Sequence, residues 1–244
     1  KVYKVYISLP YGEFVPELVK LGCEFVDTQI SRRGTNTITD FRLILKYRNI
    51  IKHIKPDVVL TYTIKPNVYG GLVCKILGTP YISNITGLGT SIENKGLVRK
   101  IALLLYKIGL SSASAIFFQN TENKQYFIEN KIVNEDKIIL IPGSGVNLDY
   151  HKFEEYPEDD GRLRILFIGR IMKDKGIEEL FKAASIVKKS YPNVEFHLIG
   201  SKEEDYSDQM DQLIRKEIIY YHGRQNDVRP FIRNSHVIIN QSYH

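Results

Sequence analysis

Short apolar runs alternate along this chain with segments whose apolar residues recur at helical spacing, and this alternation restricts the fold more than any other feature. The runs are four to six residues long, and most are apolar at consecutive positions rather than at every second one. Strands buried on both faces of a parallel sheet have this composition. Strands that alternate with helices therefore predict an α/β protein with doubly wound parallel sheets.

The pattern places nine strands and eight helices. The predicted strands are Val5–Leu9, Asp57–Tyr62, Tyr81–Ile85, Ala115–Gln119, Ile138–Ile141, Ile165–Ile168, Glu195–Ile199, Ile218–Tyr221 and Val237–Gln241. The predicted helices are Val15–Leu21, Phe41–Ile54, Asn67–Leu77, Leu97–Leu110, Glu122–Asn130, Ile177–Ser190, Tyr206–Arg215 and Val228–Asn234. Their apolar residues recur at intervals of three and four, which is the spacing of an amphipathic helix.

A polar, acidic and turn-rich stretch from Pro142 to Arg164 interrupts the alternation. It predicts two Rossmann-like units, residues 1–146 and 164–244, joined by a linker over 147–163. The second unit is short for a doubly wound domain, and the first lacks the usual opening strand and helix. We therefore expect the chain to be truncated at both ends.

Charge is unevenly distributed over the chain. Residues 1–150 contain 19 Lys and Arg against 12 Asp and Glu, whereas residues 151–244 contain 15 against 16. A basic first half attracts phosphates or an anionic membrane surface. Nucleic acid would suit the charge as well, but the sequence has no basic run with interleaved aromatics and no helix-turn-helix pattern, so we expect no nucleic-acid partner.

The sequence gives several indications of cellular setting. No apolar run reaches the roughly 18 to 20 residues that cross a bilayer. The two cysteines, Cys23 and Cys74, form no metal-spaced motif and are interpreted as reduced thiols in or near the core. We expect a cytoplasmic protein, in peripheral contact with the inner face of the plasma membrane.

An anion site is predicted after the strand that ends at Ile168, because ligands bind beyond the carboxyl ends of strands in open α/β sheets. Gly169 allows a ligand to approach the backbone closely. A helix begins near Gly176, and its free N–H groups favour an anion. Arg170 offers a planar fork of donors and Lys175 a point charge, which together suit a diphosphate. A turn with solvated basic residues is the alternative.

Other strand ends give weaker signals. Gly200 follows one strand of the second unit, and His222, Gly223 and Arg224 follow another, where backbone groups could meet a nucleotide base. The six histidines have no metal-ligand spacing, and no phosphate-binding loop of the GxxxxGK[ST] type is present. We expect no metal and no other cofactor.

In the first unit, a glycine-containing loop follows the strand that ends at Ile85. Thr86, Gly87, Gly89 and Thr90 belong to this loop, which either approaches a ligand or is only a flexible connection. Asn120 follows the next strand and is either a second ligand residue or simply the cap of the helix after it. Gly143, Gly145 and Asn147, at the start of the linker, either line a cleft or form a hinge.

Three stretches together resemble a known family. "RILFIGRIMKDKGIEELFKAASIV", "IPGSGVNLDYHKF" and "PNVYGGLVCKILGTPYISNITGLGTSIENKG" are similar to the retaining glycosyltransferases of the GT4 family, which have the GT-B fold of two Rossmann-like domains facing a cleft. The resemblance implies that Arg170 and Lys175 hold the diphosphate of a nucleotide-sugar donor and act in catalysis. It implies an interdomain connector at Gly143, Gly145 and Asn147, and an acceptor side near Thr86 and Thr90.

The resemblance is to the bacterial subgroup that builds capsule, O-antigen and related glycans on a lipid carrier. It implies transfer of a hexose or N-acetylhexosamine from a UDP-linked donor to a lipid-linked saccharide. The chain departs from the family because the first glycine-rich loop and the paired glutamates are absent, and because Thr86-Gly87 stands where many members have a histidine. We expect the chain alone to be inactive. The alternatives are a nucleotide-sugar epimerase of the same fold and a non-catalytic fragment that binds a nucleotide sugar.

Overall fold

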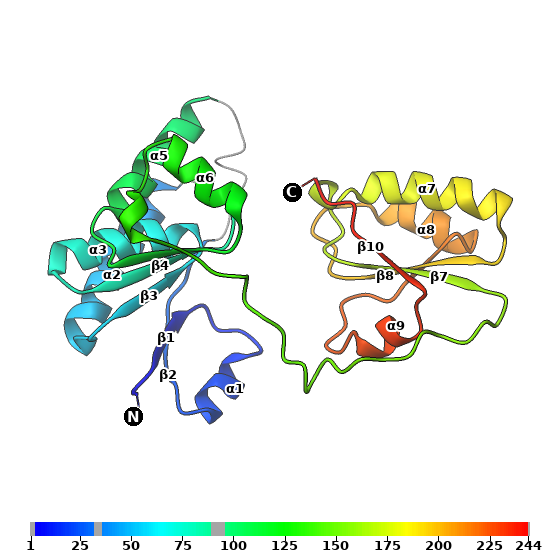
Figure 1. Ribbon diagram of the computed structural model, residues 1–244, viewed down its shortest axis with the longest axis horizontal. Helices are drawn as coiled ribbons and strands as arrows, with labels where there is room; N and C mark the ends of the chain where they lie inside the picture. The colour runs from blue at the N-terminus through cyan, green and yellow to red at the C-terminus, as the bar shows by residue number, and fades with distance from the viewer. Residues whose placement is uncertain (1–2, 32–35, 89–95, 244) are drawn as a thin grey trace. The chain divides into compact units, whose positions relative to one another are not determined.

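The computed structural model describes residues 3–31, 36–88 and 96–243. The chain divides into two compact units, residues 1–145 and 146–244 (Figure 1). The division falls one residue before the predicted end of the first unit. No helix among the described residues has the length and the apolar character needed to span a membrane.

The first unit contains a parallel sheet of four strands in the order β3-β4-β5-β6. These strands are Val59–Tyr62, Tyr81–Ile85, Ala115–Phe118 and Ile138–Leu140. The helices between them are α3 (Gly71–Leu77), α5 (Leu97–Leu110) and α6 (Thr121–Glu129), and α2 (Thr37–Ile54) precedes β3. The carboxyl ends of all four strands lie at one edge of the sheet, because the strands are parallel.

A second, two-stranded parallel sheet precedes α2. It pairs β1 (Tyr6–Leu9) with β2 (Glu24–Asp27), and α1 (Val15–Lys20) connects the two strands. The sequence pattern did not predict β2, because only its two central residues are apolar and that run is too short to stand out.

The first unit packs through a close crossing of α5 against α3 and the short π-helix Pro66–Gly70 that leads into α3. A Cβ on Gly71 would lie 2.2 Å from the carbonyl oxygen of Gly109, so the backbones are nearly in contact there. The hydroxyl of Tyr81 donates to the same carbonyl at 2.7 Å. The predicted helix over 67–77 thus begins with a π turn, which brings these glycines together. Cys74 is buried in this core, and burial raises the pKa of its thiol to about 12.

The second unit is built on the parallel strand order β10-β7-β8-β9. These strands are Val237–Ile239, Leu163–Ile168, Val194–Ile199 and Ile219–Tyr221. Helices α7 (Ile177–Ser190) and α8 (Ser207–Arg215) cover one face, and α9 (Arg229–Arg233) lies on the other (Figure 1). The strand order reverses between β7 and β10, and such switch points are where doubly wound sheets bind ligands.

The core of the second unit lies between the sheet and the helices α7 and α8. Phe167, Phe196 and Leu198 point from the strands to Phe181 and Met210 on the helices, and all five are buried. Both units are α/β with parallel sheets and helices, so the predicted fold class is confirmed.

Candidate functional site

Three of the predicted glycines meet at the carboxyl edge of the second sheet. Gly169, Gly200 and Gly223 follow β7, β8 and β9. The amide of Gly169 donates to the carbonyl of Ile199 at 2.9 Å, and the amide of Gly200 donates to the carbonyl of Gly223 at 2.9 Å. A Cβ on Gly200 would lie 1.8 Å from the carbonyl oxygen of Gly169. The backbones of the three strand ends therefore touch directly, and we call these residues the glycine rim.

Backbone hydrogen bonds extend this contact beyond the strands. The amide of Ile171 donates to the carbonyl of Ser201 at 2.9 Å, and the amide of Glu203 donates to the carbonyl of Ile171 at 3.1 Å. The hydroxyl of Tyr221 donates to the carbonyl of Gly200 at 2.7 Å. These bonds fix the loops after β7 and β8 against each other, so the glycine rim is held in one conformation.

Arg170 and Lys175 lie in the loop that leaves the glycine rim. Arg170 is exposed and Lys175 is partly exposed. Within the described part of the chain, neither side chain has an ion pair or a hydrogen bond. A short 3₁₀ turn, Lys173–Lys175, carries Lys175 to the start of α7. The structure thus leaves both positive charges available to an anion at this edge.

The start of α7 is less open than the sequence predicted. The segment after β10 lies against it: a Cβ on Gly176 would be 2.4 Å from the carbonyl oxygen of Gln241. Tyr243 donates its amide to the carbonyl of Asp174 at 3.1 Å and its hydroxyl to Glu179 at 2.6 Å. Gly176 has a φ of 64° and is buried, so its glycine identity is needed for this contact. Sequence reasoning missed the contact, because nothing in the sequence pairs residues 241–243 with 174–179.

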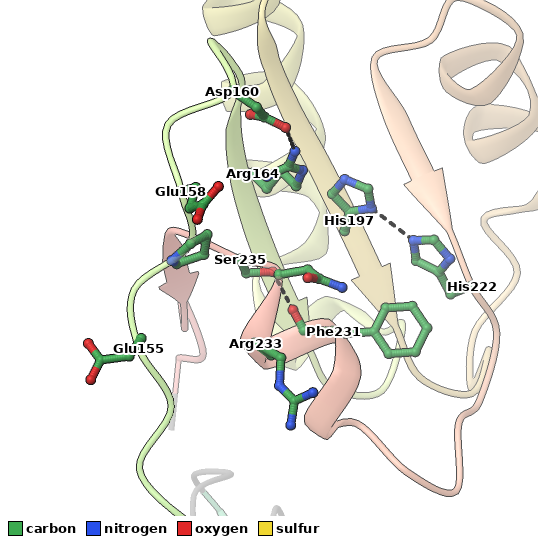
Figure 2. A pocket seen from close by; sticks show the side chains of 11 residues that line it. Glu155, Glu158, Asp160, Arg164, His197, His222, Phe231, Arg233 and Ser235 are labelled. Carbon is green, nitrogen blue, oxygen red and sulfur yellow. Dashed lines mark hydrogen bonds and ion pairs between the residues drawn. The ribbon is translucent and has the colours of Figure 1, made fainter.

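Arg224 is exposed in the loop after Gly223, whose φ is 68°. The side chain of the residue before them, His222, lines a cavity of about 660 Å³ that α9 borders (Figure 2). The cavity is lined by the linker, β7, β8 and α9 as well. None of the predicted donor residues lines this cavity.

A chain of polar contacts crosses this cavity. Nδ1 of His197 lies 2.9 Å from Nε2 of His222, and their rings are stacked with centroids 5.2 Å apart (Figure 2). Nε2 of His197 lies 3.3 Å from a carboxylate oxygen of Glu195. With both rings neutral, His222 donates to His197 and His197 donates to Glu195, and this arrangement satisfies all three groups. Arg164 pairs with Asp160, and Arg162 and Arg164 both approach the Glu195 carboxylate, at 2.9 and 3.7 Å.

Protonation of His222 is expected to destabilise the second unit. Burial, and then the neighbouring His197, lower the pKa of His222 below its ordinary value of about 6.5. The unfolded chain takes up a proton as the pH falls through about 6.5, while the folded chain takes it up only at lower pH, so stability falls with pH in this window. We expect His222→Gln to flatten the change in the free energy of unfolding between pH values of about 7.5 and 5.5, measured by urea denaturation.

Three paired carboxylates titrate at lower pH than the range of this measurement, so they do not contribute to the measured change. The pKa values of Glu154, Asp160 and Asp227 are lowered, so these groups protonate below their ordinary values of about 4. Their contribution to stability is lost only under more acidic conditions than those compared. Equal pH dependence of the parent and the variant would contradict the assignment.

The predicted acceptor-side residues lie at the carboxyl edge of the first sheet. Thr86 and Gly87 follow β4, while Gly89 and Thr90 lie outside the described residues. Asn120 caps α6: its side-chain oxygen accepts from the amide of Asn123 at 2.8 Å. The structure therefore gives Asn120 the capping function that was the alternative to a ligand residue.

The same edge carries a polar cluster that the sequence did not reveal. Lys65 and Tyr69 both bind Asp40, at 2.6 and 2.8 Å, and all three side chains are largely shielded from water. Thr61 donates to Asn67 at 2.7 Å beside them. Asp40 lies 25 residues or more before its partners, so only the fold brings these groups together.

The residues predicted as a hinge lie at the boundary of the two units. Gly143 and Gly145 have φ values of 78° and 72°, and the division falls directly after Gly145. The side chain of Asn147 accepts from the amides of Asp149 and Tyr150 at 3.0 and 3.2 Å, which forms a local turn. Movement at these residues stays a prediction.

Comparison with known proteins assigns a family to each unit. Residues 1–120 match the family model described as "Glycosyl transferase 4-like", and residues 150–244 match the model described as "Glycosyl transferases group 1". The second match includes the whole glycine rim, Arg170 and Lys175. The two matches together leave out only residues 121–149, at the end of the first unit and the start of the linker.

Curated relatives and solved structures agree with these models. The chain is 25% identical, over 98% of its length and 67% of the relative's, to N,N'-diacetylbacillosaminyl-diphospho-undecaprenol alpha-1,3-N-acetylgalactosaminyltransferase of Campylobacter jejuni. It is 28% identical, over 75% of its length and 51% of the relative's, to the capsular polysaccharide biosynthesis glycosyltransferase CapM of Staphylococcus aureus. The chain thus spans about half to two thirds of these relatives.

The fold is shared with a solved structure. Alr3699/HepE of Anabaena, in complex with UDP and glucose, superimposes with a TM-score of 0.73 at 16% identity, over 97% of this chain and 66% of that one. This likeness shows the fold.

Proposed function

The chain belongs to the glycosyltransferases of the GT4 family with the GT-B fold, and we propose on this premise that the protein transfers a hexose or N-acetylhexosamine from a UDP-linked donor to a lipid-linked saccharide. The Campylobacter relative is named for a diphospho-undecaprenol-linked acceptor, and the Staphylococcus relative for capsule synthesis. Surface-glycan synthesis by transfer to such an acceptor is the function that these names support.

One observation carries the donor half of this proposal: two cations that have no partner among the described residues follow Gly169 of the glycine rim in the chain. The glycine rim lets a diphosphate approach the sheet edge, and Arg170 and Lys175 bind its oxygens. When the bond between the anomeric carbon and the diphosphate oxygen breaks, the electron pair stays on the diphosphate. The two cations stabilise that charge as it develops, so the proposal requires no metal ion.

The acceptor half of the proposal rests on the first unit. An acceptor hydroxyl near Thr86 and Gly87 would form the new bond to the anomeric carbon on the face that the diphosphate leaves, and its proton would pass to the departing diphosphate oxygen. Attack on that face retains the anomeric configuration, as in the family. The surplus of basic residues over 1–150 suits a diphosphate-linked lipid at an anionic membrane. We propose peripheral contact with the cytoplasmic face of that membrane.

Product analysis tests this function. The full-length protein, not this chain alone, is incubated with UDP-sugars, with and without a polyprenyl-diphosphate-linked saccharide, and the products are identified by mass spectrometry. We expect a glycolipid one sugar larger, and UDP release that depends on the acceptor. An isomerised UDP-sugar formed without acceptor would instead identify an epimerase, and UDP-sugar binding with no product would identify a non-catalytic fragment.

A further inference from the structure

The outer face of α5 carries an apolar stripe that nothing in the described part of the chain covers. Its four members are 72%, 49%, 57% and 39% exposed: Leu97, Ile101, Leu104 and Ile108. At 3.6 residues per turn, these positions fall within an arc of about 60° along the helix. The other side of α5 buries Tyr106 and Leu110 in the core. Large apolar surfaces left in water mark sites of interaction.

Basic residues border this stripe, and α5 itself has no acidic residue. Between Glu93 and Glu122 the sequence has no acidic residue and four basic ones. Lys100 and Lys107 lie along one border of the stripe by their helical spacing, and both are exposed. Neither has an ion pair within the described residues.

Two further lysines meet at the end of α5. The ammonium groups of Lys75 and Lys137 donate to the hydroxyl and the carbonyl of Ser111, at 3.0 and 3.2 Å. Positive charge therefore accompanies the stripe along its side and at its carboxyl end. An apolar stripe in this setting is complementary to a surface that is both apolar and anionic.

This combination fits a lipid surface better than a protein surface. Protein interfaces are depleted in lysine. Helices that lie in the membrane interface instead combine an apolar face with lysines, whose aliphatic stems follow the acyl chains while the ammonium groups reach the phosphates. We propose that α5 docks the first unit on an anionic bilayer, with the helix lying in the plane of the membrane.

The inference deepens the proposed function by naming the surface that meets the membrane of the acceptor. Gly96 caps the start of α5, and Thr86 and Gly87 lie shortly before it in the sequence. Docking through α5 would thus hold the acceptor side of the first unit at the membrane. The link between docking and the acceptor rests on the proposed function, but membrane binding itself is measured without any sugar transfer.

A shorter apolar stripe on α2 provides an internal competitor. Ile38, Phe41 and Leu45 are exposed at helical spacing, and the one acidic residue of α2, Asp40, is shielded and paired with Lys65. This stripe has three members against four on α5, so it offers fewer apolar side chains to a bilayer. The proposal therefore predicts that α5 and not α2 determines membrane binding.

The test is co-sedimentation of the chain with vesicles of phosphatidylcholine containing about a third phosphatidylglycerol, against phosphatidylcholine alone. We expect binding to the anionic vesicles that weakens as salt is raised. The variant Leu97→Gln/Ile101→Gln/Leu104→Gln should bind at least about tenfold more weakly, because three apolar side chains no longer enter the bilayer. Lys100→Glu/Lys107→Glu should weaken binding to a similar degree.

Two control variants match the first. Ile186→Gln/Ile214→Gln changes two residues of the second unit that are 67% and 39% exposed, and it should bind like the parent chain. Ile38→Gln/Phe41→Gln/Leu45→Gln should also retain most binding. Because the changed side chains are exposed, equal melting temperatures are expected, and the charge variant tests the proposal if the triple variant does not fold.

Three results would overturn the inference. They are no binding of the parent chain to anionic vesicles, loss of binding in the α2 variant but not in the α5 variants, and a dimer in solution that the α5 variant converts to a monomer. The last result would mean that a second copy covers the stripe. Sugar transfer to a water-soluble acceptor should be unchanged in the α5 variants, so failure of docking and failure of the proposed function give different results.

Discussion

Replacing Arg170 and Lys175 together by alanine in the full-length protein is expected to lower sugar transfer by at least about a hundredfold. Each side chain would make a charge-assisted contact with the donor diphosphate, and such contacts contribute about 1.5–3 kcal/mol each. The effect on the turnover rate should exceed the effect on donor affinity, because the charge on the diphosphate grows as the anomeric bond breaks. Steady-state kinetics with the preferred UDP-sugar measures both quantities.

A matched control is available in the last turns of two helices of the same unit. Arg215 and Lys189 lie in the last turns of α8 and α7, and both are exposed. Arg215→Ala/Lys189→Ala removes the same charge from the second unit. It should leave transfer within about twofold of the parent. Equal losses in the two double variants would mean that overall charge, not the site, determines activity.

Gly200→Ala is expected to unfold much of the second unit. The new methyl group would lie 1.8 Å from the carbonyl oxygen of Gly169, and φ at this position is 152°, where side chains are rarely accommodated. Overpacking against a backbone that two neighbouring strands fix costs about 3 kcal/mol or more. For a unit of this size, that loss corresponds to a melting temperature lower by roughly 10–20 °C, measured by scanning calorimetry.

Gly223→Ala separates the steric clash from the backbone strain at positive φ. Gly223 also has a positive φ, 68°, but a Cβ there would meet no atom within 4 Å. Its replacement should cost only the backbone strain, about 1 kcal/mol. A Gly200→Ala variant that is no less stable than Gly223→Ala would show that the glycine rim is not closely packed.

The sequence predicted the fold closely where local patterns determine it. The apolar run Ile165–Ile168 and the helical pattern Ile177–Ser190 became β7 and α7 with little change of boundary. The glycines after β7, β8 and β9 could be placed at one edge, because parallel strands bring their carboxyl ends together. What the sequence could not predict is how closely they touch.

Features that depend on residues distant in the chain were not predictable. The Asp40–Lys65 pair and the contact of Gln241 with Gly176 join positions that no local pattern relates. The predicted anion site at the start of α7 differs most from the observed structure, because the segment after β10 lies against Gly176. Over residues 3–31, 36–88 and 96–243, Arg170 and Lys175 find no ion-pair partner, and they carry the candidate site.

The most direct test compares UDP with uridine by isothermal titration calorimetry. The central claim is that Arg170, Lys175 and the glycine rim bind the diphosphate of the donor. The parent chain should bind UDP at least about a hundredfold more tightly than uridine, since only UDP offers the diphosphate. In Arg170→Ala/Lys175→Ala that difference should nearly vanish, while uridine binds as before. A UDP preference that is unchanged in the double variant would contradict the account.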